Sequence, residues 1–227
     1  TRFDDYQLGK YRGEKADLSL VDIVNLVHPK HTETIKKLVD GTLRSTDTWE
    51  VELSGAGQKA ENDEQKDQLK KDVWIKLIRE KKIGYFALLR NLRNILEQAP
   101  EIVDEACEML VNEVLIKKSL VLPFRFVTAL DQITETNLEG SRKVIIALNK
   151  AIDICLSNVP KFDGKTLVVV DSSGSMSGQP AKIAALFAAV LVKSNDADLI
   201  LFSDDAKYVT LNPMDSTITL ANSIPFI

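Results

Sequence analysis

The chain has 227 residues, of which 44% are hydrophobic and 27% are charged, and its formal net charge is −4. This length suffices for one large domain or two small ones. The balanced charge argues against a protein that is basic overall, but it allows a local basic face. The sequence contains no apolar run long enough to span a membrane and no signal peptide at its polar start, so we expect a cytoplasmic globular protein. Because the first residue is Thr1 and not methionine, we also expect the chain to be part of a longer one.

Residues 1 to about 160 show helical patterns only. Ser19 and Asp22 have the spacing of a capping box, which predicts a helix that Pro29 ends. A second short helix is predicted over 34–39 and a possible third over 48–53. The next stretch, 55–71, is polar and has no aromatic residue, so we expect its first half to be a loop.

Longer helices are predicted in the second half of this region. Gly84 precedes one of them, and Pro100 and Pro123 stand where proline is favoured, in the first turn of a helix. Successive helices with short joints are typical of α-solenoid repeats, although the sequence shows no strict period. Cys107 and Cys155 fall in these helices without metal-ligand spacing, which indicates free thiols in a reducing compartment. The predicted ranges are 72–80, 85–99, 101–119, 124–133 and 138–156.

After Pro160 the pattern changes to strand, loop, helix and strand, which places a domain boundary near 158–165. The run Leu167–Val170 is apolar and β-branched, which predicts a strand buried on both faces of a parallel sheet. A helix over 180–193 follows the loop after this strand. We expect further elements at 199–202 (a buried strand), 208–211 (an edge strand) and 216–222 (a short helix).

Asp171, Ser173 and Ser175 alternate in the loop after the first strand. An extended loop would turn their three oxygens to one side. A carboxylate and two hydroxyls are hard ligands, which favour Mg²⁺ over Ca²⁺. In the alternative interpretation, Asp and Ser only cap the helix that follows.

The residues VVVDSSGSMSG around this loop resemble the metal-ion-dependent adhesion site of von Willebrand factor A domains. The resemblance implies that Asp171, Ser173 and Ser175 hold a divalent cation together with a Thr and an Asp from later loops. Those later residues have no counterpart before Ile227, so we expect an incomplete site that binds Mg²⁺ weakly. It also implies that a carboxylate of a protein partner could complete the coordination.

The stretch Lys82–Leu96, KIGYFALLRNLRNIL, resembles the signature helix of the TROVE module of the Ro autoantigen family. Agreement in order comes from GKYRGEKADLSLVDIVNLVHPK near the N-terminus, DVWIKLIRE just before the signature helix, and Pro123–Leu130. The resemblance implies a multidomain α plus α/β protein. Residues 1–160 would form α-helical HEAT-like repeats, the C-terminal part of a TROVE ring. Residues 161–227 would form the start of a truncated, Rossmann-like von Willebrand factor A domain.

The resemblance also implies binding of noncoding RNA, including single-stranded 3′ ends of misfolded RNAs, in RNA quality control or ribonucleoprotein assembly. In that family, basic residues and a histidine of this region contact the RNA, so the resemblance implies that Lys10, Arg12, Lys15 and His28 are the RNA-binding residues. Basic side chains on a repeat surface can neutralise phosphates. The alternative for this cluster is an ordinary solvated face, because acidic residues are interspersed.

Three further expectations concern the rest of the chain. Arg90 and Asn94 are predicted to bond carbonyls of the next repeat, and Trp49 and Trp74 are predicted to be core anchors. We predict no enzyme, since the sequence contains no G-x-S-x-G, P-loop or H-E-x-x-H motif. The competing hypothesis is a metal-dependent protein-interaction scaffold that binds no RNA.

Overall fold

The structure is a computed structural model that describes residues 5, 8, 17–43 and 49–226. It is mostly helical with a small three-stranded mixed sheet. The chain forms two compact units, Thr1–Val73 and Trp74–Ile227. These units do not test the predicted division into 1–160 and 161–227, which stays a prediction. No helix in the described ranges combines the length and the apolar character needed to cross a bilayer.

The first unit contains a short helix pair, α2 (Leu20–Val27) and α3 (Glu33–Val39). The predicted capping box is confirmed. The Asp22 carboxylate accepts the Ser19 backbone N–H at 2.8 Å, and the Ser19 hydroxyl accepts the Asp22 N–H at 3.2 Å. The small core beneath this pair consists of Leu8, Ile35, Leu38 and Leu43.

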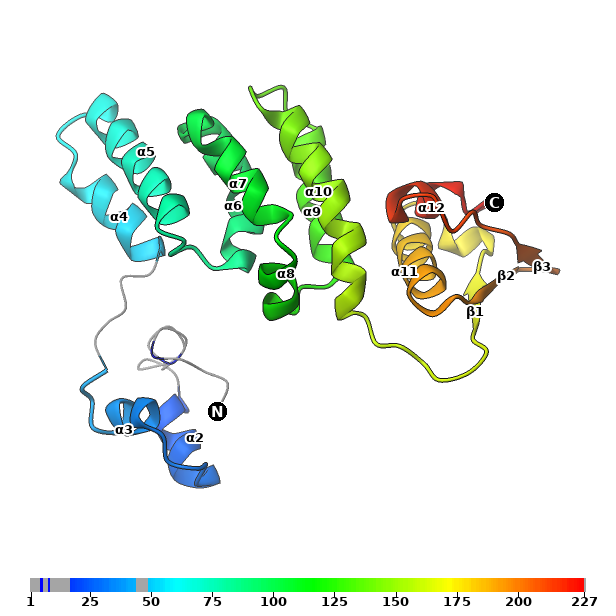
Figure 1. The fold of residues 1–227 in the computed structure, drawn as a ribbon, viewed down its shortest axis with the longest axis horizontal. Helices are drawn as coiled ribbons and strands as arrows, with labels where there is room; N and C mark the ends of the chain where they lie inside the picture. The colour runs from blue at the N-terminus through cyan, green and yellow to red at the C-terminus, as the bar shows by residue number, and fades with distance from the viewer. Residues whose placement is uncertain (1–4, 6–7, 9–16, 44–48, 227) are drawn as a thin grey trace. The chain divides into compact units, whose positions relative to one another are not determined.

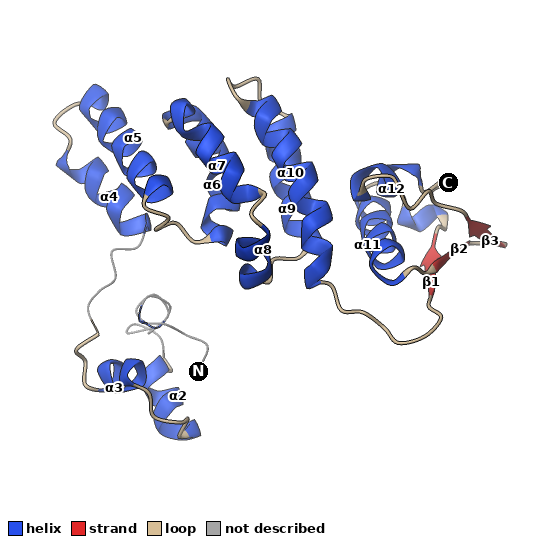
Figure 2. Ribbon diagram, in the orientation of Figure 1, coloured by secondary structure: helices blue, strands red, loops and turns tan. Residues whose placement is uncertain are grey.

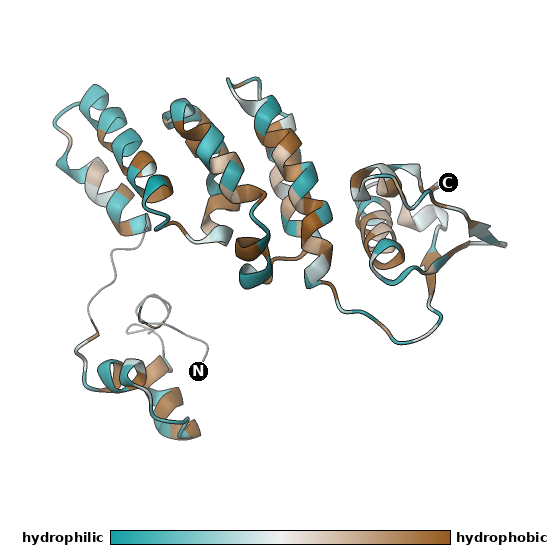
Figure 3. Cartoon of the chain, viewed as in Figure 1, coloured by the Kyte–Doolittle hydropathy of each residue, from teal (hydrophilic) through white to brown (hydrophobic). Residues whose placement is uncertain are grey.

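Two polar helices follow, α4 (Trp49–Lys59) and α5 (Asp63–Arg79), and the loop predicted for the first half of 55–71 is wrong. Only Ala56 of α4 is buried, and the buried residues of α5 all lie in its last two turns. Figure 3 shows both helices as mostly hydrophilic. Lys, Glu and Gln have high helix propensity even where a segment lacks an apolar stripe. The absence of a periodic apolar pattern therefore did not indicate a loop. The Asn62 side chain accepts the Gln65 N–H at 2.8 Å and supports the start of α5.

In the second unit, four helices lie side by side: α6, α7, α9 and α10 (Figure 1). Their facing stripes form a closed core in which Ile102, Leu110, Phe126 and Leu148 are fully buried. The helical elements of this part are α6 (Tyr85–Gln98), η1 (Pro100–Ile102), α7 (Val103–Leu110), α8 (Glu113–Ser119), α9 (Pro123–Thr134), α10 (Ser141–Cys155) and η2 (Leu156–Asn158).

The single helix predicted over 101–119 is wrong, because it is divided into η1, α7 and α8. Asn112 lies at the break, and its side chain accepts the Leu115 N–H at 3.1 Å as the N-cap of α8. An asparagine that bonds the backbone in this way competes with a continuous helix. Trp74 is confirmed as a core anchor, with 1% of its surface exposed and its indole N–H bonded to Gln98 at 2.9 Å. Trp49 is half-buried.

The sheet has the order β1 (Leu167–Asp171), β2 (Asp198–Phe202) and β3 (Ala206–Val209). β1 and β2 are parallel, and β3 is an antiparallel edge strand, which confirms the predicted edge position, although the strand covers 206–209 and not 208–211. The helices that accompany the sheet are α11 (Gln179–Asn195) and α12 (Thr217–Ser223). Val170, Leu199 and Leu201 point into a core shared with these helices.

The opposite face of the sheet is open in the described part of the chain, so the predicted burial of both faces is wrong (Figure 2). Register aligns Val169, Ile200 and Tyr208 across this face. Val169 is 55% exposed and Tyr208 is 71% exposed. Helices α11 and α12 supply one layer only, and strand alternation leaves every second side chain of β1 uncovered.

Asp153 on α10 connects the helices to the sheet part of this unit. Its carboxylate accepts the backbone N–H and the hydroxyl of Thr217, at 3.0 and 2.6 Å, and lies 3.1 Å from the Lys193 ammonium. Thr217 is the fully buried first residue of α12, whose N-cap is Ser216, so Asp153 bonds the first turn of a helix that lies 64 residues further along the chain. Burial alone would raise the pKa of Asp153. The Thr217 hydrogen bonds and Lys193 outweigh burial and hold the pKa below its usual value.

Candidate functional site

His28 ends α2 in a left-handed conformation. Its φ and ψ are 46° and 56°, and its backbone N–H bonds the Val24 carbonyl at 3.0 Å. This conformation is uncommon for a residue with a Cβ. The imidazole is exposed, and its Nδ1 lies 3.4 Å from the Leu26 carbonyl oxygen. The turn therefore presents the ring to solvent at the point where α2 gives way to Pro29.

A pocket of about 350 Å³ lies between α2 and α3, and His28 is one of its walls. His31 and Lys36 line it as well, and both are exposed. Two imidazoles and an ammonium can donate hydrogen bonds to an anion, and the rings can stack on a base. The remaining lining residues are Val24, Asn25, Pro29, Ile35, Val39 and Asp40.

Of the predicted RNA-binding residues, only His28 belongs to the described part of the chain. Lys10, Arg12 and Lys15 lie outside the described residues. Sequence reasoning missed Lys36, because the residue belongs to the next helix and only the fold of the α2–α3 turn brings it beside His28. Its neighbour Lys37 instead pairs with Asp5 at 2.7 Å.

Helix α6 carries the arginines and asparagines of the sequence RNLRN. Arg93 pairs with Glu97 one turn later at 2.8 Å. Asn94 donates to the Asn91 side chain at 3.0 Å, so its predicted bond to a carbonyl of the next repeat is wrong. Side chains four or three residues apart on one helix are neighbours, and local partners were closer than the next repeat. Arg90 is exposed and has no hydrogen-bond partner among the described residues.

The loop after β1 brings Asp171, Ser173 and Ser175 together. Asp171 Oδ1 accepts the Ser173 backbone N–H at 2.8 Å, and the Ser173 and Ser175 hydroxyl oxygens are 3.0 Å apart. The loop is not extended throughout, since Gly174–Met176 forms a 3-10 turn. The backbone N–H and then the hydroxyl of Ser173 bond the Asp171 carboxylate and lower its pKa, so it is ionised at neutral pH.

The spacing of these oxygens suits a small octahedral cation. Two adjacent ligands on Mg²⁺, each at about 2.1 Å, are separated by about 3.0 Å. The two hydroxyl oxygens have this separation, and the Asp171 carboxylate lies beside them, where its Oδ1 accepts the Ser173 N–H. At α11 the N-cap is Gly178 with no side-chain cap, while the bond from the Ser173 N–H to Asp171 is a local contact that also fits the capping alternative. No cluster of three His, Cys, Asp or Glu suited to a metal occurs in the described residues, so serine ligands are part of this hypothesis.

Comparison with known proteins assigns the family. The TROVE domain profile matches residues 41–172, which is more than half of the chain. The chain belongs to the TROVE domain family. A solved structure, the RO (RSR) protein of Deinococcus radiodurans, has a similar fold, with a TM-score of 0.59 and 20% sequence identity. The likeness covers 97% of this chain but 54% of that protein, so the chain spans about half of its length.

The TROVE match places the two candidate sites differently. It runs from Gly41 through the helices to Ser172, so it includes Asp171 but neither Ser173 nor Ser175. His28 lies before its start, although the likeness to the RO (RSR) fold extends over nearly the whole chain. Family membership is therefore established by the helices between the sites, and the role of each site depends on its own geometry.

Proposed function

We propose that the chain is an RNA-binding protein of the Ro type, which binds small noncoding RNAs and single-stranded 3′ ends of misfolded RNAs. The observation that carries this proposal is the TROVE match over 41–172. In the same proposal, the helices are HEAT-like repeats of a TROVE ring. The sheet with α11 and α12 is the first part of a Rossmann-like von Willebrand factor A domain.

His28, Lys10, Arg12 and Lys15 are the proposed RNA contacts. The lysines and the arginine would neutralise phosphates, which gives affinity without base preference. His28 would contact a nucleotide at the pocket between α2 and α3, where Lys36 adds a donor from the other wall. A pocket with two imidazoles and one ammonium supports this assignment, because such groups suit both a phosphate and a stacked base.

The proposed role is RNA quality control or ribonucleoprotein assembly in the cytoplasm, by binding and not by catalysis. Both cysteines are free, which agrees with a reducing compartment. Burial raises the pKa of Cys107 to about 11 and of Cys155 to about 12, so neither is a reactive thiolate.

We further propose that Asp171, Ser173 and Ser175 hold Mg²⁺. The ion would supply a positive charge that can bind a carboxylate of a protein partner. The hydroxyl separation of 3.0 Å and the lowered pKa of Asp171 support this site. The same geometry favours the second candidate function, a metal-dependent protein-interaction scaffold without RNA binding.

Filter binding separates the two functions. The probes are a structured RNA with a single-stranded 3′ tail and the same RNA with a blunt end, each titrated over a salt series. We expect tighter binding of the tailed RNA, with affinity that falls steeply as salt rises. No binding of either RNA at low salt would contradict the RNA proposal and leave the scaffold.

Calorimetry tests the metal. We expect weak binding of Mg²⁺ or Mn²⁺ that is lost in Asp171→Ala and retained in Asp204→Ala, which removes an exposed carboxylate after β2. Three protein ligands with one carboxylate leave half of an octahedral shell to water. Tight binding would show that our ligand count is too small. An undetectable ion in every variant would remove the metal role.

A further inference from the structure

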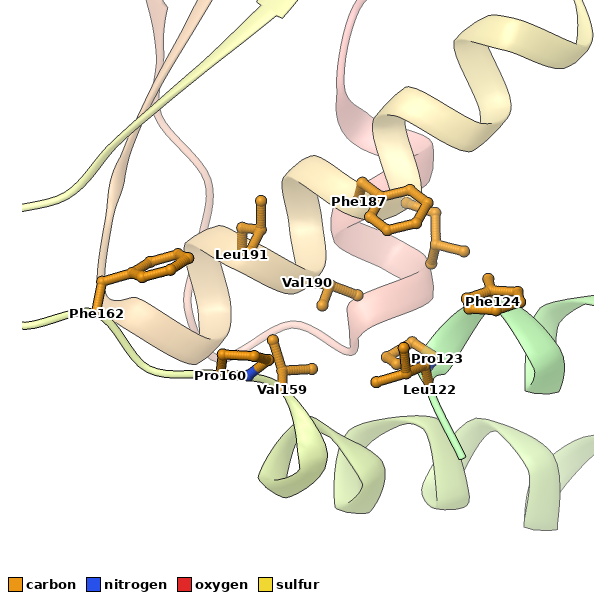
Figure 4. Close-up of a pocket in the computed structure, with 10 residues that line it drawn as sticks. Leu122, Pro123, Phe124, Val159, Pro160, Phe162, Phe187, Val190 and Leu191 are labelled. Carbon is orange, nitrogen blue, oxygen red and sulfur yellow. The ribbon is translucent and has the colours of Figure 1, made fainter. Parts of the chain in front are cut away.

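A small apolar cavity lies along α11 in the second unit. Its volume is about 190 Å³, and every residue that lines it is Leu, Val, Pro or Phe. One wall is the stripe of α11 that includes Phe187 and Leu191, and the others are the start of α9 and the linker after η2 (Figure 4). Phe162 lies at one end of the cavity, and Phe124 and Phe187 lie at the other.

Three large apolar side chains at the rim of this cavity are exposed to solvent. Phe162 is 55% exposed, Phe187 is 48% exposed and Leu122 is 39% exposed. The rings of Phe124 and Phe187 stack with their centroids 6.4 Å apart, which holds that end of the cavity in shape. Several exposed aromatic side chains around one hollow are typical of a protein interface.

Positive charge flanks the cavity. The Arg125 guanidinium lies over the rings of Phe124 and Phe86, at 5.0 and 5.4 Å, and is held there by cation–π contacts. Lys161 is exposed between Pro160 and Phe162, which both line the cavity. Neither cation pairs with a carboxylate in the part of the chain that the structure describes. The linker also carries Asp163, but lysines at 161 and 165 outnumber it.

We propose that this cavity binds an acidic segment of a protein partner, which inserts one aromatic or leucine side chain. Cofactor and drug sites usually enclose about 300–1,000 Å³, which is more than this cavity offers. A cavity of about 150 Å³ can hold benzene, so a volume of 190 Å³ fits one large side chain. Asp or Glu beside that anchor would pair with Arg125 and Lys161.

The lining argues against RNA as the occupant. It offers no polar side chain to a base edge, and the faces of Phe124 and Phe187 already pack on each other, so a nucleotide base has no partner inside it. None of the residues that line the cavity belongs to the loop of Asp171, so we expect binding that is independent of a divalent cation. This interaction can therefore be tested independently of both functions proposed above.

Selection of phage-displayed random peptides on the whole chain tests the proposal. We expect the selected peptides to combine an aromatic residue or leucine with Asp or Glu. Fluorescence anisotropy of the best peptide should show binding that is unchanged by EDTA and lost at least about tenfold in Phe187→Glu, as for the anchor contact of an interface. The matched control Ile146→Glu replaces a similarly exposed residue of α10, and its affinity should stay unchanged.

Charge reversal tests the rim separately. Arg125→Glu should weaken binding by several-fold at low salt and less at high salt, while Arg142→Glu, at an exposed position of α10, should have no effect. Failure to select any peptide, equal affinity for Phe187→Glu and wild type, or selected peptides without acidic residues would overturn the proposal. Displacement of the peptide by single-stranded RNA, together with loss of RNA binding in Phe187→Glu, would assign the cavity to nucleic acid instead.

Discussion

The stacked helices α6 to α10 and the sheet β1 to β3 bury their apolar residues differently. Each helix presents one stripe, and neighbouring helices cover it, so Phe126 and Leu148 have no exposed surface. The sheet has two faces, and α11 and α12 cover only one of them. Val170 is buried, whereas its neighbour Val169 is 55% exposed.

The difference shows what an apolar pattern reports. The apolar stripe of an amphipathic helix predicts which face is buried, because the polar residues of the same helix mark the exposed face. A strand in which every residue is apolar does not show which face is buried. Whether one or both faces are covered depends on elements elsewhere in the chain. The following variants should separate the closed core from the open face.

Phe126→Ala should have the largest effect. The ring is fully buried among the helices and lies 6.0 Å from the Tyr85 ring, so its removal leaves a cavity. We expect the free energy of unfolding to fall by about 3–5 kcal/mol in urea titrations. A loss of less than about 1 kcal/mol would mean that this core is loosely packed.

Asp153→Ala should have the second-largest effect on stability, since it removes the hydrogen bonds that connect the stacked helices to α12. It removes two hydrogen bonds to Thr217 in the first turn of α12 and the carboxylate partner of Lys193, and we expect the free energy of unfolding to fall by about 2–3 kcal/mol. The pKa of Asp153 is lowered in the folded chain, so its contribution is present above its unfolded pKa and lost as pH falls below about 4. Asp153→Asn should therefore weaken the fall in stability in that range. An unchanged acid profile would contradict the assigned role.

Gly140→Ala should have an intermediate effect. Gly140 has φ +83° before α10, and an added Cβ would lie 3.2 Å from Leu96 and from Val103. Gly164 has φ +86° with open space around it, so Gly164→Ala measures backbone strain alone. We expect losses of about 1–2 kcal/mol at Gly164 and about 1 kcal/mol more at Gly140. Equal losses would show that the helices adjust to the added methyl group.

The smallest effects should appear in the sheet. Val170→Thr places a hydroxyl in the core and should cost about 1–2 kcal/mol, whereas Val169→Thr should lie within about 0.5 kcal/mol of wild type. Both changes keep a β-branched side chain, so strand propensity is matched. A comparable loss at both positions would show that the second face is covered in solution.

Much of this fold is predictable from local sequence. The capping box of Ser19 and Asp22, the proline start at Pro123, and the succession of strand, helix and strand after Pro160 all follow from short-range chemistry. The errors are of another kind. At Asn112 the backbone can continue the helix or end it with a side-chain hydrogen bond to the Leu115 N–H, and the sequence does not decide between the two. The exposure of one face of β1 depends on which elements pack on the sheet.

The candidate sites divide in the same way. The loop of Asp171 could be found from sequence, because its three oxygens follow one another within five residues. The pocket beside His28 could not, since Lys36 reaches it only through the turn between α2 and α3. The apolar cavity along α11 could not be predicted from sequence patterns either, because its walls come from three separate segments of the chain.

The salt dependence of RNA binding by lysine variants tests the central claim most directly. Binding of a single-stranded RNA is measured over a salt series for wild type, Lys10→Ala, Lys15→Ala and the control Lys150→Ala, which removes an exposed lysine of α10. Each of the first two variants should weaken binding and reduce the slope of log K against log salt by about 0.7, the value for one lost phosphate contact on a single strand. The control should keep both the affinity and the slope of wild type. Unchanged affinity and slope in Lys10→Ala and Lys15→Ala would contradict the proposed RNA-binding face.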